Sequence, residues 1–358
     1  MKPPPPRPLI AAARPVEIPD HHREGKLRLD MNENQWGPSP RVLAALSPLL
    51  EEDGRPLSLY GFHEELLDLL SERLNIPTDE ILITAGADEG ISLLFEAFRE
   101  PHDTVVLPDP TFVTFLTEAE TTGETIQRVP YREDLQFPRQ EFLEAMAARP
   151  RIAIIVNPNN PTGTAVEIDW IAKLCTAAPD TLVVCDEAYV EYHGETTLSM
   201  RSRPANLAVV RTFSKAYGLA GLRVAFVVAH AEVVASLLKV RTPFSVSTPA
   251  LVAACAALED PDFLHAHVQM VRKEMSSLVG ALRGLGFDAM STRTNFILVR
   301  AGHDSPEVAA TLARQGIIVS DRSHDAGLEG VLRIAIGRPD QNERLVNALT
   351  RAARKDQR

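Results

Sequence analysis

The stretch IAIIVNPNNPTGTAVEIDWIAKLCTAAPDTLVVCD, residues 152–186, contains the repeating unit of the fold. It begins and ends with runs rich in Val and Ile, residues 152–156 and 181–186. Between them, residues 167–178 place apolar side chains three and four positions apart, which is typical of an amphipathic helix. Strands of a parallel sheet with both faces covered are continuously apolar, and helices connect them. The stretch therefore predicts a strand, a helix and a second strand of a parallel sheet.

The same alternation extends over most of residues 79–230. Further strands are predicted at residues 80–84, 104–108, 207–213 and 223–229, with a helical pattern at residues 88–100. After residue 246 two long helical patterns precede the apolar runs 296–300, 316–320 and 331–337, which indicates a smaller α+β domain. We therefore expect an α/β fold in three parts: an N-terminal arm (1–35), a large domain with a mainly parallel sheet covered by helices (36–245), and a small C-terminal α+β domain (246–358).

The composition excludes several classes of protein. The net charge is −11 and the pI is near 5.5, so no basic surface for nucleic acid is indicated. Apolar runs such as VAFVVA are far shorter than the roughly 20 residues of a membrane helix. Three cysteines without a CxxC spacing predict neither a disulfide framework nor a zinc site, and they favour the cytoplasm. The proline-rich start predicts an extended or disordered arm, and the adjacent His21 and His22 are a poor metal site.

Unusual polar groups follow the predicted strands at their carboxyl ends. The segment AGADEG (85–90) offers small residues and a helix start, whose free backbone N–H groups suit a phosphate. The turn NPNNPTG (157–163) follows the strand 152–156, Asp186 ends the strand 181–186, and Lys215 comes after the strand 207–213. Because ligands bind outside the carboxyl ends of parallel strands, we expect these groups to meet in one site.

Each group also has a simpler explanation. A helix start with small residues occurs in ordinary tight turns, Asp186 has the position of a helix cap, and most lysines are solvated. Together, however, a phosphate cradle, a buried carboxylate and a lysine among small residues suit pyridoxal phosphate. That cofactor needs an amine for covalent attachment, an anion opposite its pyridine nitrogen, and donors for its phosphate.

Three segments carry a family resemblance: NPNNPTG, DEAYVEY (186–192) and RTFSKAYGLAGLR (211–223). With them, the sequence resembles the fold-type I pyridoxal-phosphate aminotransferases of the histidinol-phosphate aminotransferase family, from residues 29–40 to 331–345. The resemblance implies an enzyme of amino-acid metabolism that moves an amino group between an α-amino acid and a 2-oxo acid. A pyridoxal-phosphate decarboxylase on the same scaffold is an alternative. A non-catalytic regulator would typically carry a DNA-binding domain, for which the residues before the match are too few.

The resemblance assigns three catalytic residues. Lys215 binds the cofactor covalently and then moves the proton between the substrate Cα and the cofactor. Asp186 pairs with the pyridine nitrogen and favours its protonated form. Tyr189 hydrogen-bonds the phenolate oxygen of the cofactor together with Asn160. The remaining contacts implied by the resemblance are Gly86, Ala87, Asp88, Thr212, Ser214 and Arg223 around the phosphate, Phe112 stacked on the ring, and Arg333 on the substrate carboxylate.

The resemblance also implies a homodimer with shared active sites, because Tyr60 matches a tyrosine that reaches the cofactor phosphate of the second subunit. Asn34 and Phe244 are further expected substrate contacts. Relatives that use histidinol phosphate commonly hold its phosphate with two tyrosines and an arginine, where this chain has Glu17, Phe244 and Ser320. Arg322, two residues later, is a possible replacement for that arginine.

A carboxylate at position 17 would repel a phosphate and attract a cation. We therefore expect a substrate with a polar or cationic side chain, bound at its far end by Glu17. Histidinol phosphate stays the alternative substrate. A Glu17 side chain that faces solvent or pairs with an arginine of the arm is the alternative interpretation of this position.

Overall fold

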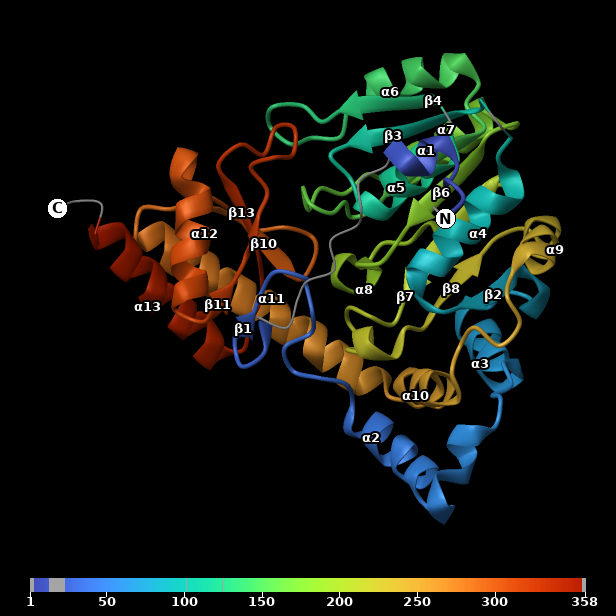
Figure 1. Ribbon diagram of the computed structural model, residues 1–358, viewed down its shortest axis with the longest axis horizontal. Coiled ribbons are helices and arrows are strands. Elements are labelled where there is room, and N and C mark those ends of the chain that lie inside the picture. Colours follow the sequence, from blue (N-terminus) through green and yellow to red (C-terminus); the bar gives the residue numbers. More distant parts are fainter. Residues whose placement is uncertain (1–2, 13–22, 101, 124, 356–358) are drawn as a thin grey trace.

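The computed structural model describes residues 3–12, 23–100, 102–123 and 125–355. Its larger part is built around a seven-stranded sheet, and its smaller part around a four-stranded antiparallel sheet (Figure 1). The large sheet has the order β2-β8-β7-β6-β5-β3-β4. The predicted α/β fold with a mainly parallel sheet is confirmed.

The seven strands are β2 (Ile81–Thr84), β3 (Thr104–Asp109), β4 (Thr125–Pro130), β5 (Ile152–Val156), β6 (Leu182–Asp186), β7 (Leu207–Thr212) and β8 (Ala225–Val228). Strand β8 runs antiparallel to both of its neighbours, and the other pairs are parallel. The sequence did not predict β4, an edge strand whose residues are mostly exposed or half-buried. All of the predicted strands of this sheet are present, with ends shifted by at most two residues.

Both faces of the sheet are covered, which explains its continuously apolar strands. Neighbouring residues of β5 show this, because Ile154 and Ile155 are both fully buried in the cores on opposite faces. One face packs against α3 (Glu64–Leu74), α6 (Arg139–Ala145), α7 (Ile168–Ala177) and α10 (Thr248–Leu258). The other packs against α4 (Gly86–Phe98), α5 (Val113–Thr122) and α9 (Ala231–Val240).

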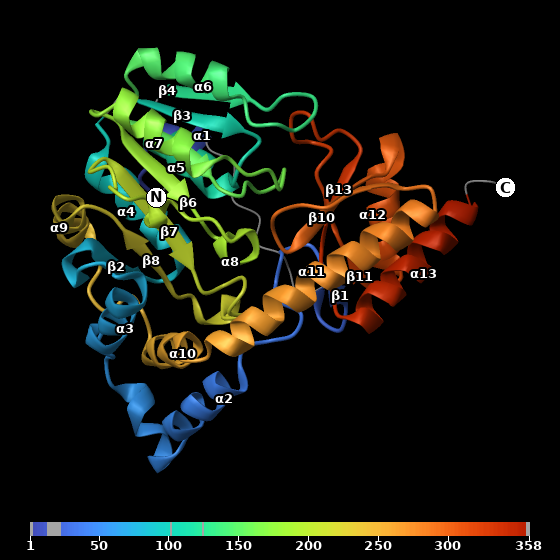
Figure 2. The same ribbon diagram turned by 180° about the vertical axis from the view of Figure 1, so that it is seen from behind.

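The long helix α11 (Pro261–Gly284) runs from the large part into the smaller one (Figures 1 and 2). There the strands β9 (Asp288–Met290), β10 (Phe296–Arg300), β12 (Ser320–Asp321) and β13 (Val331–Ala335) form the antiparallel sheet in the order β12-β13-β10-β9. Helices α12 (Ser305–Arg314) and α13 (Pro339–Lys355) complete this part. The predicted run 316–320 is divided between β12 and the short strand β11 (Ile317–Ile318).

The segment of residues 27–29 pairs with the smaller part. Strand β1 (Leu27–Arg28) pairs in parallel with β11, and the carbonyl oxygen of Leu29 accepts a hydrogen bond from the N–H of Ala335 at 2.8 Å. Earlier in the chain, Pro8–Ala12 forms the short helix α1 next to α5, where the sequence predicted an extended or disordered arm. No helix of the described residues is long and apolar enough to cross a membrane.

Candidate active site

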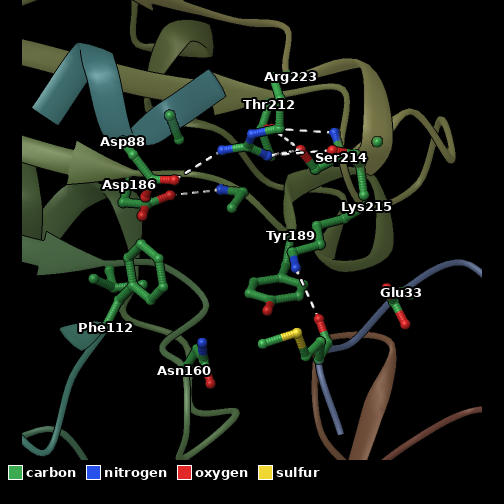
Figure 3. Close-up of a pocket in the computed structure, with 16 residues that line it drawn as sticks. Glu33, Asp88, Phe112, Asn160, Asp186, Tyr189, Thr212, Ser214, Lys215 and Arg223 are labelled. Carbon is green, nitrogen blue, oxygen red and sulfur yellow. Dashed lines mark hydrogen bonds and ion pairs between the residues drawn. The ribbon is translucent and has the colours of Figure 1, made fainter. Parts of the chain in front are cut away.

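A cavity of about 330 Å³ lies at the carboxyl ends of the parallel strands, where the sequence predicted a site (Figure 3). This size suits a small-molecule ligand. Of the predicted residues, those that line it are Ala87, Asp88, Phe112, Asn160, Asp186, Tyr189, Thr212, Ser214, Lys215 and Arg223. The lining residues that the sequence did not predict are Met31, Glu33, Val156, Ala188, Ala220 and Gly221.

Asp186, the last residue of β6, provides a buried carboxylate on the cavity wall. One carboxylate oxygen accepts the N–H of Ala188 at 2.9 Å, and the residue is 3% exposed. Burial raises the pKa of Asp186 to about 7, although the charge of Lys215 opposes this rise. The hydrogen bond with Ala188 is of the kind that a helix cap makes, which was the simpler explanation of Asp186. The side chain also lines the cavity, however.

Lys215 follows β7, and its side chain extends past the ring of Tyr189 (Figure 3). Its Nζ donates a hydrogen bond to the carbonyl oxygen of Met31 at 3.1 Å and lies 5.9 Å from the centre of the Tyr189 ring. Burial, followed by the charge of Arg333, lowers the pKa of Lys215 to about 8. A lysine with a lowered pKa is more often neutral and therefore a better nucleophile.

Tyr189 and Asn160 occupy the wall below Lys215. The Tyr189 ring packs edge-on against Phe296 with 5.7 Å between centres, and burial raises the pKa of its phenol to about 12. Its hydroxyl oxygen accepts a hydrogen bond from Nδ2 of Asn32 at 2.8 Å. The amide oxygen of Asn160 accepts a hydrogen bond from Arg333.

The turn NPNNPTG is held by its first and third residues. Asn157 exchanges two hydrogen bonds with the backbone of Val166, at 2.9 and 2.8 Å. Asn159 donates to the carbonyl of Pro110 at 3.0 Å and accepts from Thr111 at 2.9 Å. These contacts fix the turn, so that Asn160 can line the cavity.

The opposite end of the cavity suits an anion. Helix α4 begins at Gly86, whose φ of +83° favours glycine, and a Cβ at Gly86 would lie 2.5 Å from Nη2 of Arg223. The absence of a side chain thus lets the Arg223 guanidinium approach the N-terminus of the helix. Arg223 donates to Asp88 at 2.8 Å and contacts the Ser214 hydroxyl at 3.5 Å. The Thr212 hydroxyl donates to Ser214 at 2.9 Å.

A helix N-terminus, a guanidinium and two hydroxyls form a donor set that fits a phosphate group. A carboxylate and a lysine with shifted pKa values lie in the same cavity. These residues therefore fit pyridoxal phosphate at both its phosphate and its ring.

Phe112 lines the cavity, whereas the predicted Arg333 and Gly86 are not among its lining residues and lie next to it. Figure 3 shows the ring of Phe112 at the cavity, and this ring meets Phe115 edge-on at 6.4 Å between centres. Arg333, in β13, is 7% exposed and donates to Asn160 and to the carbonyl oxygen of Asp30. Its Nε has no hydrogen-bond partner among the described residues. Burial lowers the pKa of Arg333 to about 10.

Several predicted residues lie elsewhere. Tyr60 is 73% exposed and stacks on Phe244 at 4.4 Å between ring centres, and neither lines the cavity. The Asn34 amide donates to the carbonyl oxygen of Ala216 at 3.0 Å and lies 3.2 Å from Nε2 of His267, also outside the cavity lining. The roles of Tyr60, Asn34 and Phe244 stay predictions. Glu17, His21 and His22 lie outside the described residues.

The fold and the cavity together define a fold-type I pyridoxal-phosphate enzyme. The model of the family "Aminotransferase class I and II" matches residues 24–349. A histidinol-phosphate aminotransferase from Symbiobacterium thermophilum is 37% identical over 350 residues, 95% of this chain and 94% of the relative. Histidinol-phosphate aminotransferase 1 of Pseudomonas aeruginosa is 33% identical over 331 residues, 90% of this chain and 92% of the relative.

The solved histidinol-phosphate aminotransferase of Sinorhizobium meliloti, a complex with pyridoxal-5'-phosphate, superposes with a TM-score of 0.86 at 25% identity, covering 98% of this chain and 97% of that one. The chain therefore belongs to the class I and II aminotransferase family. Its cofactor is pyridoxal phosphate and its activity is amino-group transfer, as the sequence predicted.

Proposed function

We propose that, in amino transfer, one group of cavity residues acts at the ring of the cofactor and another binds its phosphate. When bound, pyridoxal phosphate supplies an electron sink for the substrate Cα. Lys215 holds the cofactor covalently and, once free, takes the proton from Cα and returns it at the cofactor carbon. The lowered pKa of Lys215 supports this role, because a general base works best near the ambient pH.

Asp186 is proposed to hold a proton on the pyridine nitrogen. Burial raises the pKa of Asp186 to about 7, and the hydrogen bond from Ala188 and the charge of Lys215 oppose this rise. A pyridinium beside it would bring this pKa down, because an opposite charge favours the ionised carboxylate. Tyr189 and Asn160 are proposed to contact the phenolate oxygen, with Phe112 stacked on the ring. The phosphate is assigned to Gly86, Ala87, Asp88, Thr212, Ser214 and Arg223.

Arg333 is proposed to bind the carboxylate of the substrate. It is buried, it contacts Asn160 at the cavity, and its Nε is without a partner among the described residues. A planar guanidinium binds a carboxylate through two parallel hydrogen bonds, which fixes the orientation of the substrate. The single observation that carries the proposed function is the convergence of Lys215, Asp186 and the Arg223 cradle on one cavity.

Two kinds of amino donor are candidates for the substrate. The names of the relatives favour histidinol phosphate. The residues around Arg333 favour an α-amino acid without a phosphate: the neutral Ser320 pairs with Arg333 across β12 and β13, and Nε of Arg322 contacts Asp325 at 2.6 Å. A phosphate of nearly two charges is best held by several unpaired cations. We therefore propose an α-amino acid with a polar or cationic side chain, whose far end Glu17 contacts.

A screen of amino donors tests this substrate class. Wild-type protein is mixed with each amino acid and with histidinol phosphate, and the absorbance change of the bound cofactor is followed. We expect the highest kcat/KM with an amino acid, and a selective loss of cationic donors in Glu17→Gln. Ser320→Arg should raise kcat/KM for histidinol phosphate about tenfold, since a hydrogen bond to a charged group contributes about 1.5 kcal/mol.

Ser320→Met, which adds length without charge, is the matched control. Efficient use of histidinol phosphate by the wild type, with Glu17→Gln unchanged on every donor, would replace this substrate class by the alternative.

The exposed apolar surface near Tyr60 supports a homodimer. Phe62 is 76% exposed, Leu59 60% and Leu57 50%, beside the exposed pair of Tyr60 and Phe244. Such a concentration of exposed apolar side chains is typical of an interface. We propose that a second copy covers this surface and that Tyr60 reaches the phosphate of its neighbour.

Mixing two weakened variants tests the shared site. Tyr60→Phe and Lys215→Ala proteins should each be weak alone and regain activity after subunit exchange. Random exchange makes about half of the dimers hybrids with one fully intact site, so about a quarter of the sites should recover. Subunit exchange is verified by native mass spectrometry with one variant tagged. No recovery after verified exchange would mean that Tyr60 acts within its own subunit or plays no part.

We further propose the three-part division at residues 35 and 245, and a cytoplasmic location. A hydrophobic core formed mostly by residues 268–349 supports a smaller domain, and Leu27, Leu29, Tyr189 and Tyr192 also belong to this core. The three cysteines are free and buried, which suits a reducing compartment.

A further inference from the structure

Asn32 connects the smaller part of the molecule to the cavity. It follows Met31, whose carbonyl oxygen accepts Lys215, and it is 1% exposed. Its φ of +55° lies in the left-handed region, which asparagine tolerates better than most residues. The carbonyl oxygen of Asn32 accepts a hydrogen bond from Nδ2 of Asn295 at 2.9 Å. The backbone of Asn32 is therefore held from the smaller part, while its side chain reaches Tyr189 in the large one.

In the hydrogen bond between Asn32 and Tyr189, the Asn32 amide is the donor. Nδ2 of Asn32 lies 2.8 Å from the Tyr189 hydroxyl, and an amide nitrogen can only donate. The phenol oxygen therefore accepts this hydrogen bond, and its own proton is left for a different partner. Among the hydrogen bonds of the described residues, the Tyr189 hydroxyl donates none, and its residue lines the cavity.

We propose that Asn32 is a positioning residue that keeps the phenol proton of Tyr189 directed at the phenolate oxygen of the bound cofactor. This inference rests on the role proposed above for Tyr189. A hydrogen bond donated to the phenolate stabilises its charge, so the bound cofactor loses its proton at a lower pH. Asn32 acts on that pH through Tyr189 and without touching the cofactor.

The surroundings of Tyr189 keep its proton available. The charged groups that face it are Arg333, Asp186 and Lys215, and Phe296 packs on its ring. Burial outweighs the attraction of Arg333 and raises the pKa of the phenol to about 12. The phenol therefore stays protonated throughout the range in which the enzyme would be assayed.

The test follows the absorbance of the bound cofactor against pH in a double-mutant cycle of Asn32→Asp and Tyr189→Phe. A carboxylate only accepts, so it takes the phenol proton, and Asp tolerates the left-handed backbone. The midpoint pH should rise by about one unit in Asn32→Asp, and similarly in Tyr189→Phe. The new negative charge raises the midpoint pH whether residue 189 is Tyr or Phe. The part of the shift that acts through Tyr189 is the difference between these two shifts. Asn32→Asp must therefore shift the midpoint less when residue 189 is Phe.

Asn32→Gly tests the amide without adding a charge, because it removes the side chain and the glycine tolerates the left-handed backbone. Its midpoint should rise, by less than that of Asn32→Asp, because the phenol proton is then no longer oriented toward the phenolate; a midpoint equal to that of the wild type would overturn the proposal. A fall in Asn32→Gly would show that the amide oxygen normally takes the phenol proton, and it would overturn the proposal even if Asn32→Asp failed to fold. Equal shifts of Asn32→Asp in both backgrounds would also overturn it. An unchanged midpoint in Tyr189→Phe would instead refute the role of Tyr189 itself. Thermal unfolding without cofactor and the cofactor Kd check that each variant is folded.

Discussion

Lys215→Ala should bind pyridoxal phosphate without a covalent bond and lose at least about 10⁴-fold in turnover, because both the attachment and the proton transfer are removed. The phosphate cradle around Arg223 is untouched by the change, so cofactor binding should be weakened but not abolished. Turnover is measured with the preferred amino donor of the screen, and binding by equilibrium dialysis.

Borohydride reduction of the wild type followed by peptide mass analysis should place the cofactor on Lys215. Lys173 and Lys239 are the matched controls, since both are exposed lysines on helices, α7 and α9. Their replacement by Ala should leave turnover unchanged. A cofactor found on Lys173 or Lys239 would refute the assignment.

Asp186→Asn should reduce turnover by about 10³-fold, which corresponds to about 4 kcal/mol of barrier. The amide cannot stabilise a positive pyridine nitrogen, although it keeps an oxygen for the N–H of Ala188. Cofactor affinity should change far less than turnover. A rate near that of the wild type would mean that Asp186 serves only the local contact with Ala188.

The pH dependence of the free energy of unfolding, compared between wild-type and Asp186→Asn protein without cofactor, reports the pKa of Asp186. Burial raises this pKa from its usual 3.8 to about 7. The raised pKa makes a stabilising contribution that is complete below about pH 3.8 and is lost as the pH rises through 7. Relative to wild type, Asp186→Asn should therefore gain free energy of unfolding between these values. Glu191, whose pKa is also raised to about 7, titrates in both proteins and cancels in the difference. A difference that does not vary with pH would contradict the raised pKa.

The sequence predicted the large sheet well because its strands are buried on both faces. Residues 152–156 are apolar at every position, and β5 has these same bounds. Strand β4 escaped detection because its edge position leaves polar residues along it. The reversed direction of β8 also could not be predicted, since an apolar run has the same pattern in either direction.

The site was predictable where polar groups follow strands, as Asp186 and Lys215 do. Met31 and Asn32 were missed because they are brought to the cavity from a segment more than 150 residues away in sequence. Their position depends on β1 pairing with β11, a two-residue contact with no periodic signal. Residues 29–40 belong to the family resemblance, but only Asn34 among them was predicted to have a role in the site.

The central claim is amino transfer at Lys215, and isotope-labelled nitrogen tests it most directly. Each amino acid, labelled at its amino nitrogen, is incubated with the holoenzyme and a set of 2-oxo acids, and the products are analysed by mass spectrometry. The account predicts that the label appears in a new amino acid, that the donor becomes its 2-oxo acid with all its carbons, and that Lys215→Ala forms neither product. Release of carbon dioxide with the label retained on a shortened amine would contradict it and establish a decarboxylase.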